Sequence, residues 1–327
     1  MTLLMSGGLT IAISAIVFLL ITLVLVIALL YAKTKLVPSG NIKVVVNGEK
    51  EFEAPIGGTV LGTLQAQGIY LSSACGGSGS CGQCRCQVEE GGGNILPTEV
   101  GFFSRKQIKD HWRLGCQTKV KEDMVIRVPE EVFGVKSWEC EVVSNNNVAS
   151  FIKEFVVKLP EGEKLNFKPG SYAQIVIPKF DIKYSDMDID DRFKSEWDKF
   201  KLWPLTCKNE EETIRAYSMA NYPAEGNIIT LNVRIATPPF DRSTGTWKAG
   251  IKPGIASSYI FSLKPGDKVT MSGPYGDFHI LETNNEMLYI GGGAGMAPLR
   301  AQLLHLFKTV KTGRKVSYWY GARSKNE

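Results

Sequence analysis

Strong compositional bias of any kind is missing from this 327-residue sequence. Its formal charge is only +5, and its lysines and arginines are scattered, so nothing favours a nucleic acid as partner. Hydrophobic residues make up 44% of the chain, an ordinary globular share that argues against disorder. At this length we expect two or three domains, each with its own core.

A disulfide framework is also lacking. The chain has seven cysteines, an odd number, and Cys86, Cys140 and Cys207 follow no framework spacing. This pattern indicates a reducing compartment. Cys86 lies two residues after Cys84 on an expected strand and points the same way. We interpret Cys86 as a packing thiol.

The other four cysteines form the most informative motif of the sequence. Cys75, Cys81 and Cys84 come from one glycine-rich loop, and Cys116 follows about thirty residues later. This spacing is close to the plant-type C-x4-C-x2-C…C pattern of 2Fe-2S ferredoxins, with one extra residue in the first gap. Glycines in the loop permit positive φ angles, with which backbone N–H groups turn toward the sulfurs. These glycines are Gly76, Gly77, Gly79 and Gly82.

Two other metal centres compete with the 2Fe-2S interpretation. Structural zinc sites usually pair two C-x2-C motifs, whereas this sequence has one such motif and a lone distant cysteine. A Rieske centre needs two histidine ligands, and neither ligand segment carries a Cys-x-His pair. His111 lies near Cys116 and is interpreted as a surface or packing residue. The spacing therefore favours a 2Fe-2S cluster, with zinc as the alternative.

Residues 9–31 carry no charged side chain. At 1.5 Å per residue this run spans roughly 34 Å, enough to cross the hydrocarbon core of a bilayer. A cleaved signal peptide is the alternative, which the length of the run and the lack of a preceding basic residue disfavour. Lys33 and Lys35 follow at once, so the positive-inside rule places the downstream domains in the cytoplasm. The run has no ionisable residue for an ion path, so we expect an anchor or a helix that packs on partner helices.

Periodicity divides the chain after this anchor, residues 1–36, into three parts. Residues 37–132 are predicted to form a small mixed α+β domain around the cysteine loop, with one helix and an Asn47-Gly48 hairpin turn. Residues 133–282 show short alternating strands typical of an antiparallel barrel. Residues 283–327 predict a strand, a glycine turn, a helix and a second strand, the start of an α/β nucleotide-binding domain.

A polar segment, residues 180–213, interrupts the barrel pattern. Asp186, Asp188 and Asp190 resemble the start of an EF-hand loop. However, the sixth position is Asp191 where glycine is needed, and the twelfth is Trp197 where a glutamate is needed. We therefore reject calcium binding and expect a solvated insertion or a docking surface.

Three short motifs favour nucleotide cofactors. Arg215 and Tyr217 share one face of an expected strand, where they suit a phosphate and a flat ring, although alone they are typical of any half-exposed strand. Residues 253–259 resemble a helix start with hydroxyl and N–H donors for an anion. Residues 291–298 form a glycine turn that lets backbone N–H groups approach a pyrophosphate, although the full Rossmann fingerprint is missing.

Taken together, the order of these motifs resembles the ferredoxin-reductase superfamily. That superfamily combines a β-grasp ferredoxin module, a flavin barrel with Arg-x-Tyr-Ser and a nucleotide module with Gly-x-Gly-x-x-Pro. Within it, the apolar run, residues 215–223, residues 232–239 and the polar segment resemble the F-subunit family of sodium-translocating NADH:quinone oxidoreductases.

This resemblance implies a membrane-anchored oxidoreductase of the bacterial inner membrane. NADH would give a hydride to FAD, and single electrons would pass through the 2Fe-2S cluster to partner subunits of the sodium-pumping complex. A reductase component of an oxygenase and a non-enzymatic membrane electron carrier are the alternatives.

The resemblance also implies a role for each matching residue. Tyr217 would lie on the flavin ring and Ser218 near the hydride-accepting nitrogen, as the two catalytic positions. The cluster ligands would be Cys75, Cys81, Cys84 and Cys116. The other FAD contacts would be Arg215, Arg234, Gly254, Ser257 and Ser258. The NADH pyrophosphate would face Gly293 and Gly295.

The nucleotide domain of this family is longer than the part present in the sequence. The sequence ends at Glu327, just after the second expected strand of that domain. We therefore expect this chain to bind FAD and the cluster but to use NADH poorly. The preference for NADH over NADPH is implied by the resemblance alone, because residues 321–323 also suit a 2′-phosphate.

Overall fold

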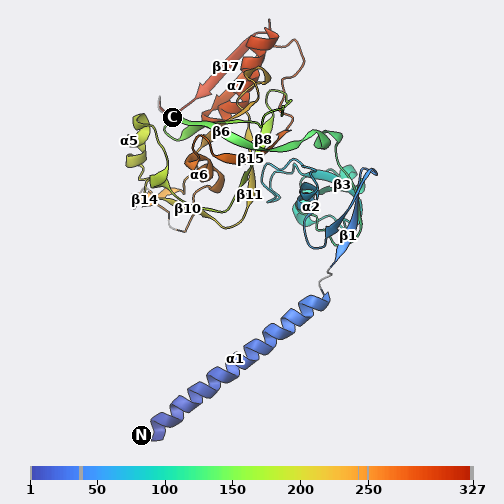
Figure 1. The fold of residues 1–327 in the computed structure, drawn as a ribbon, viewed down its shortest axis with the longest axis vertical. Coiled ribbons are helices and arrows are strands. Elements are labelled where there is room, and N and C mark those ends of the chain that lie inside the picture. The colour runs from blue at the N-terminus through green and yellow to red at the C-terminus, as the bar shows by residue number, and fades with distance from the viewer. Residues whose placement is uncertain (1, 37–39, 242, 249, 325–327) are drawn as a thin grey trace.

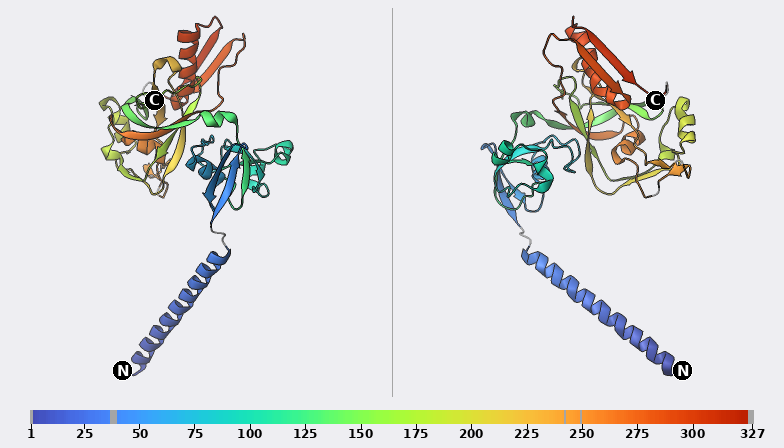
Figure 2. Two further views of the ribbon diagram at one scale, coloured as in Figure 1. Left: turned by 45° about the vertical axis from the view of Figure 1, so that its right-hand side comes forward. Right: turned by 180° about the vertical axis from the view of Figure 1, so that it is seen from behind.

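The computed structural model describes residues 2–36, 40–241, 243–248 and 250–324. Helix α1 (Thr2–Leu36) extends away from the folded domains, as two further views confirm (Figures 1 and 2). Within it, the span Ile11–Tyr31 is long and apolar enough to cross a membrane, a property that signal sequences near an N-terminus share. The predicted apolar helix is therefore present.

The first folded domain is a five-stranded mixed sheet in the order β2-β1-β5-β3-β4. Its strands are β1 (Asn41–Val46), β2 (Lys50–Pro55), β3 (Arg85–Glu90), β4 (Trp112–Leu114) and β5 (Met124–Arg127). Strands β1 and β2 are joined by the predicted turn, in which Asn47 and Gly48 have φ angles of 53° and 72°. Strand β1 pairs in parallel with β5, and α2 (Val60–Ala66) buries Val60 and Leu64 against the sheet.

Two short helices in this domain go beyond the single helix that the sequence predicted. They are α3 (Pro97–Val100) and α4 (Arg105–Lys109). Both lie in the connection from β3 to β4. Helices of four or five residues produce too little periodicity to be detected from sequence.

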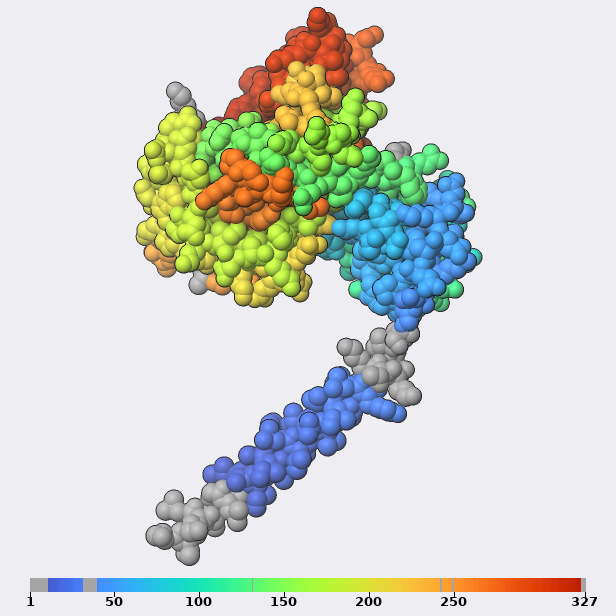
Figure 3. Space-filling view, viewed as in Figure 1, coloured from blue at the N-terminus to red at the C-terminus, as the bar shows by residue number. Residues whose placement is uncertain are grey.

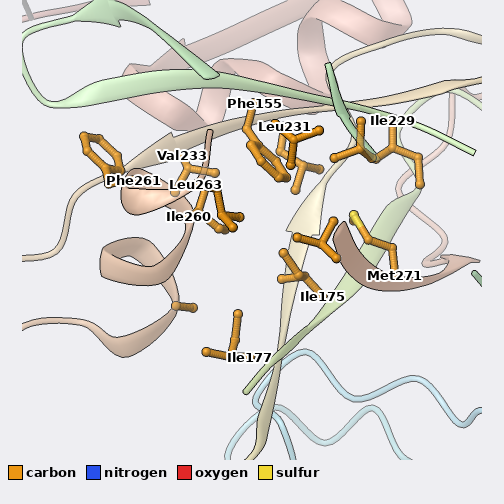
Figure 4. Packing of buried hydrophobic residues seen from close by; sticks show 14 of the residues in the cluster. Phe155, Ile175, Ile177, Ile229, Leu231, Val233, Ile260, Phe261, Leu263 and Met271 are labelled. Carbon is orange, nitrogen blue, oxygen red and sulfur yellow. The ribbon is translucent and has the colours of Figure 1, made fainter. Parts of the chain in front are cut away.

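The second domain is a six-stranded antiparallel sheet in the order β11-β8-β15-β6-β7-β12. Its strands are β6 (Lys136–Ala149), β7 (Ile152–Lys158), β8 (Tyr172–Ile177), β11 (Thr213–Ser218), β12 (Ile228–Arg234) and β15 (Lys268–Tyr275). The two edge strands meet through an isolated bridge between Met219 and Leu231, which brings the sheet close to the predicted barrel. Its core includes Phe155, Ile175, Leu231 and Phe261 (Figure 4).

Residues 180–213 fold onto this barrel rather than forming a wholly solvated insertion. They contain β9 (Phe180–Lys183), the short helix η2 (Tyr184–Asp186), α5 (Asp191–Lys199) and β10 (Thr206–Asn209). Tyr184, Phe193 and Trp197 are buried in the barrel core, and Trp197 Nε1 donates to the Ser150 carbonyl at 2.8 Å. The prediction of a solvated insertion is therefore wrong for this inner face, because the polar residues cover one side only.

Helix α6 (Ile255–Ser262) follows a small hairpin of β13 (Phe240–Asp241) and β14 (Thr246–Trp247). The third domain contains β16 (Met287–Gly292), η4 (Gly293–Gly295), α7 (Met296–Leu304), η5 (His305–Val310) and β17 (Val316–Gly321). Strands β16 and β17 are parallel, as predicted. Arg300 binds the barrel through Glu225 at 3.0 Å and the Ala220 carbonyl at 2.8 Å. In the space-filling view both the ferredoxin domain and the nucleotide domain lie directly on the barrel (Figure 3).

Candidate functional site

The cysteine loop lies between α2 and β3 and owes its shape to glycine. Gly76, Gly77, Gly79 and Gly82 all have positive φ angles, between 64° and 91°. A Cβ atom on Gly82 would overlap the Phe102 ring, so a larger residue would both strain the backbone and displace this packing. The positive φ angles predicted for these glycines are confirmed.

The four predicted ligand thiols lie in two pairs. Cys81 Sγ is 3.3 Å from Cys75 Sγ, and the thiols of Cys84 and Cys116 share a hydrogen bond. None of these cysteines is in a disulfide. Within the described residues, no three His, Cys, Asp or Glu side chains converge as they would around a single metal ion. Two pairs suit a cluster with two irons and four cysteine ligands better than one tetrahedral zinc ion.

Two of these thiols are already biased toward the thiolate that binds metal. Burial raises the pKa of Cys75, but hydrogen bonds from Ser78 and from the backbone of Cys81 and Ser80 outweigh it, so the pKa falls to about 5. The pKa of Cys116 falls to about 7, chiefly because Cys84 donates a hydrogen bond to it. The same bond, with burial, raises the pKa of Cys84. At neutral pH Cys75 is therefore mostly a thiolate, and Cys116 is about half ionised.

A buried ion pair fixes the position of the segment that leads to Cys116. Arg113 Nη2 donates to Glu99 Oε2 at 2.8 Å, and the exposed fractions of the two residues are 5% and 0%. Glu99 Oε1 also accepts the Leu114 N–H at 2.8 Å, two residues before the cysteine. The sequence did not predict this pair, because nothing in the local pattern around Glu99 or Arg113 indicates that a charged side chain is buried there.

Cys86 lies close to this pair and is fully buried. Burial raises its pKa to about 12, so it stays a thiol at neutral pH. Its burial in the sheet agrees with the interpretation of Cys86 as a packing residue.

Strand β11 carries the predicted flavin contacts, and all of its residues are half-buried. Arg215 Nη1 donates to the Ile214 carbonyl at 2.7 Å and to Thr213 Oγ1 at 2.8 Å. Tyr217 packs on the barrel core, and burial raises its pKa to about 12 against the opposing charge of Arg215. Arg215 and Tyr217 share one face of the strand and Ser218 takes the other, as the sequence predicted.

The cysteine loop and β11 are in direct contact. A Cβ atom on Gly76 would overlap both the Ile214 carbonyl oxygen and Arg215 Nη1. Gly76 directly follows the ligand residue Cys75. The predicted cluster site and the predicted flavin strand are therefore neighbours, although they lie about 140 residues apart in the chain.

The start of α6 is organised by hydroxyl groups that already have partners. Ser257 Oγ accepts the Ala236 N–H at 3.0 Å and donates to the Gly254 carbonyl at 3.1 Å. Ser258 Oγ, which is buried, donates to the same carbonyl and hydrogen-bonds the Tyr184 hydroxyl, each at 2.8 Å. The backbone N–H groups of the first helical turn, rather than these hydroxyls, are thus the natural donors for an anion.

Arg234 lies between two cavities. The first, of about 570 Å³, is lined by Arg234, Phe151 and the turn that holds Gly293 and Gly295. The second, of about 660 Å³, is lined by Arg234 and by aromatic residues, among them Trp247. The structure thus brings Arg234 to the predicted nucleotide turn. Arg215, Tyr217 and Ser218 line neither of these two cavities.

Two domain families match the chain. The 2Fe-2S iron-sulfur cluster binding domain matches residues 44–121, and the oxidoreductase FAD-binding domain matches residues 202–280. The predictions of a 2Fe-2S centre and of an FAD domain are thereby confirmed at the level of the domain, and zinc is disfavoured. The individual ligands and contacts stay predictions.

Relatives with curated names cover nearly the whole chain. The F subunit of the Na(+)-translocating NADH-quinone reductase of Actinobacillus pleuropneumoniae is 53% identical over 95% of this chain and 75% of its own length. The protein of that name from Pseudomonas aeruginosa is 51% identical over 95% of this chain and 74% of its own length. The chain thus spans about three quarters of the length of these relatives.

Solved structures support the fold. A cytochrome P450 reductase from Amycolatopsis, GcoB, superposes with a TM-score of 0.54 at 22% identity and covers 87% of this chain and 73% of its own. The ferredoxin reductase in carbazole 1,9a-dioxygenase gives a TM-score of 0.51 at 21% identity, over 88% of this chain and 74% of its own. At these identities the likeness concerns the fold alone.

Proposed function

Because the chain belongs to the F-subunit family of the Na(+)-translocating NADH-quinone reductases, we propose that it is the oxidoreductase subunit that receives electrons from NADH in such a complex. When bound, FAD accepts a hydride and the 2Fe-2S cluster carries single electrons, which is the chemistry that the two cofactors supply. The residues of this chain bind these groups, fix their distance and keep solvent from them.

The observation that carries the proposal is the contact between the cysteine loop and the flavin strand. Gly76 packs against Ile214 and Arg215, directly beside the ligand residue Cys75. A two-electron acceptor and a one-electron carrier must lie close together if electrons are to pass between them within one chain. This contact supports direct electron transfer between FAD and the cluster.

The proposed roles of individual residues follow the motif matches and the observed geometry. Arg215 would bind the FAD phosphates, while Tyr217 and Ser218 would contact the flavin ring as the catalytic positions. The cluster would be held by Cys75, Cys81, Cys84 and Cys116. The remaining FAD contacts would be Arg234, Gly254, Ser257 and Ser258. The NADH pyrophosphate would lie against Gly293 and Gly295.

The membrane and the partner subunits belong to the same proposal. Helix α1 would anchor the chain in the bacterial inner membrane, and Lys33 and Lys35, which follow its apolar span, favour cytoplasmic ferredoxin, flavin and nucleotide domains. The side chains of the span Ile11–Tyr31 are exposed, so they can pack against lipid or against helices of the other subunits.

The test is a cofactor and reduction measurement on the full chain purified in detergent. We expect FAD and a 2Fe-2S cluster in equal amounts, and slow bleaching of both when excess NADH is added, in line with the poor use of NADH expected from the sequence. A chain that holds both cofactors but is not bleached by NADH would favour the electron carrier without enzyme activity. A chain that takes up neither cofactor would refute the proposal.

A further inference from the structure

One tyrosine side chain joins the ferredoxin domain to the flavin barrel. Tyr172 begins β8, and only 9% of its surface is exposed. Its hydroxyl donates to Gln83 Oε1 at 2.9 Å, which leaves the Ser72 hydroxyl to donate in turn to the Tyr172 oxygen. Both partners belong to the cysteine loop, and Gln83 directly precedes the ligand residue Cys84.

The barrel holds the same ring in place from the other side. The rings of Tyr172 and Tyr275 are stacked, with centroids 5.3 Å apart and an interplanar angle of 21°. The Tyr275 hydroxyl is bonded to Ser272 at 2.9 Å, within the barrel. Tyr70 of the ferredoxin domain and Ala216 of β11 pack against this buried cluster. The barrel therefore holds the ring of Tyr172 in place, and the hydroxyl on this ring contacts the cysteine loop.

Tyr172 also lies beside the proposed flavin contacts. In the antiparallel pairing of β8 with β11, Tyr172 is opposite Ser218, and Ala173 is opposite Tyr217. Paired strands are about 5 Å apart. One side chain thus links the strand next to the proposed catalytic positions with the loop that carries the cluster ligands.

We propose that Tyr172 is a positioning residue that holds the cysteine loop at a fixed distance from the flavin strand for electron transfer within one chain. This inference rests on the proposed function. In each transfer the reduced flavin loses one electron and the cluster gains one, with NADH as the source of the electrons. Tyr172 keeps its oxidation state throughout and acts only through its two hydrogen bonds.

The substitution Tyr172→Phe keeps the stacked ring and removes both hydrogen bonds. Each neutral hydrogen bond corresponds to about a three- to tenfold change in a docking equilibrium. We therefore expect the rate of electron transfer from flavin to cluster to fall at least about threefold. The backbone of residues 72–84 should also exchange its amide hydrogens faster.

The matched control is Tyr275→Phe, which removes from the adjacent ring a buried hydroxyl that is hydrogen-bonded to Ser272 of the barrel rather than to the ferredoxin domain. A second variant, Ser72→Ala, removes one of the two bonds from the opposite side. If Ser72 acts through Tyr172, the double variant should transfer electrons no more slowly than Tyr172→Phe alone. If Tyr172→Phe fails to fold, Ser72→Ala still tests whether the hydrogen bonds of Tyr172 affect electron transfer.

The experiment uses the full chain loaded with FAD and cluster in detergent. Light and EDTA reduce the bound flavin, and the absorbance of the cluster then reports the transfer rate. Hydrogen exchange is measured on the same samples, together with FAD content, iron content and both midpoint potentials. A role confined to folding would change the cofactor contents, whereas a positioning role changes the rate and the exchange at unchanged contents and potentials.

The proposal is overturned if Tyr172→Phe and Ser72→Ala transfer electrons at the wild-type rate, or if Tyr275→Phe slows transfer as much as Tyr172→Phe does. Failure of the proposed function itself looks different. In that case the wild-type chain would bind no FAD or cluster, or would pass no electrons between them.

Discussion

Lys153 offers a sharp test of the electrostatics inside the flavin barrel. The residue is 1% exposed, and its Nζ donates to the Phe261 carbonyl at 3.3 Å and lies 5.4 Å from the centroid of the Phe261 ring. Burial lowers the pKa of Lys153 from 10.5 to about 8, and the charge of Asp188 opposes this only in part. This difference corresponds to about 3 kcal/mol in favour of the neutral amine.

The sign of the pH dependence follows from these two values. Between pH 8 and 10.5 the unfolded chain binds a proton at Lys153 that the folded chain has released, so Lys153 makes the unfolding free energy rise with pH. From pH 7 to 9.5 the expected rise is about 2 kcal/mol. The substitution Lys153→Met, which keeps the length of the side chain, should remove this dependence.

At pH 7 we expect Lys153→Met to be more stable than the wild type by about 2 kcal/mol, since about 3 kcal/mol of desolvation is relieved and about 1 kcal/mol of hydrogen bonding is lost. Urea unfolding followed by tryptophan fluorescence measures the difference, because Trp138 and Trp197 are buried in the same core. Lys158→Met, on the same strand but exposed, is the control and should show no such trend. A wild-type-minus-variant difference that stays constant from pH 7 to 9.5 would refute the reasoning.

Three further predictions concern the ferredoxin domain. Cys116→Ala should abolish the 2Fe-2S signal in electron paramagnetic resonance while the FAD content stays unchanged; loss of both cofactors would contradict separate sites. Glu99→Gln leaves the Arg113 charge buried without its ion partner, so urea unfolding should show this domain destabilised by about 3 kcal/mol. An unchanged free energy of unfolding would show that the pair is dispensable. Gly76→Ala should speed amide exchange at Ile214, because the added Cβ overlaps its carbonyl; unchanged exchange would show that the two surfaces are not in contact.

Local patterns predicted the elements that depend on local geometry. Asn47-Gly48 formed the expected turn, and the glycine turn before α7 was found because positive φ and helix initiation are properties of neighbouring residues. The segment 180–213 was misjudged because its average composition hid an amphipathic helix. Phe193 and Trp197 are four residues apart and both are buried, a spacing that does predict one apolar face.

Long-range polar contacts were beyond the reach of such patterns. Glu99 and Arg113 are separated by elements that the sequence did not reveal, and Lys153 lies on a strand where a lysine is ordinarily expected to face water. Tyr172 gains its partners only after two domains have come together. The candidate ligands were predictable from motifs, but the residues that hold them in place were not.

The buried pair of Glu99 and Arg113 has a consequence for the biogenesis of the metal centre. Small metal domains without a core fold only when the ion arrives, so that assembly and folding are one event. Here an aliphatic core that includes Val44, Leu64 and Leu114 packs beside this ion pair, and Glu99 accepts a hydrogen bond from the backbone of Leu114, two residues before Cys116. Because this domain has a hydrophobic core of its own, we expect the chain to fold first and a donor to deliver the cluster afterwards.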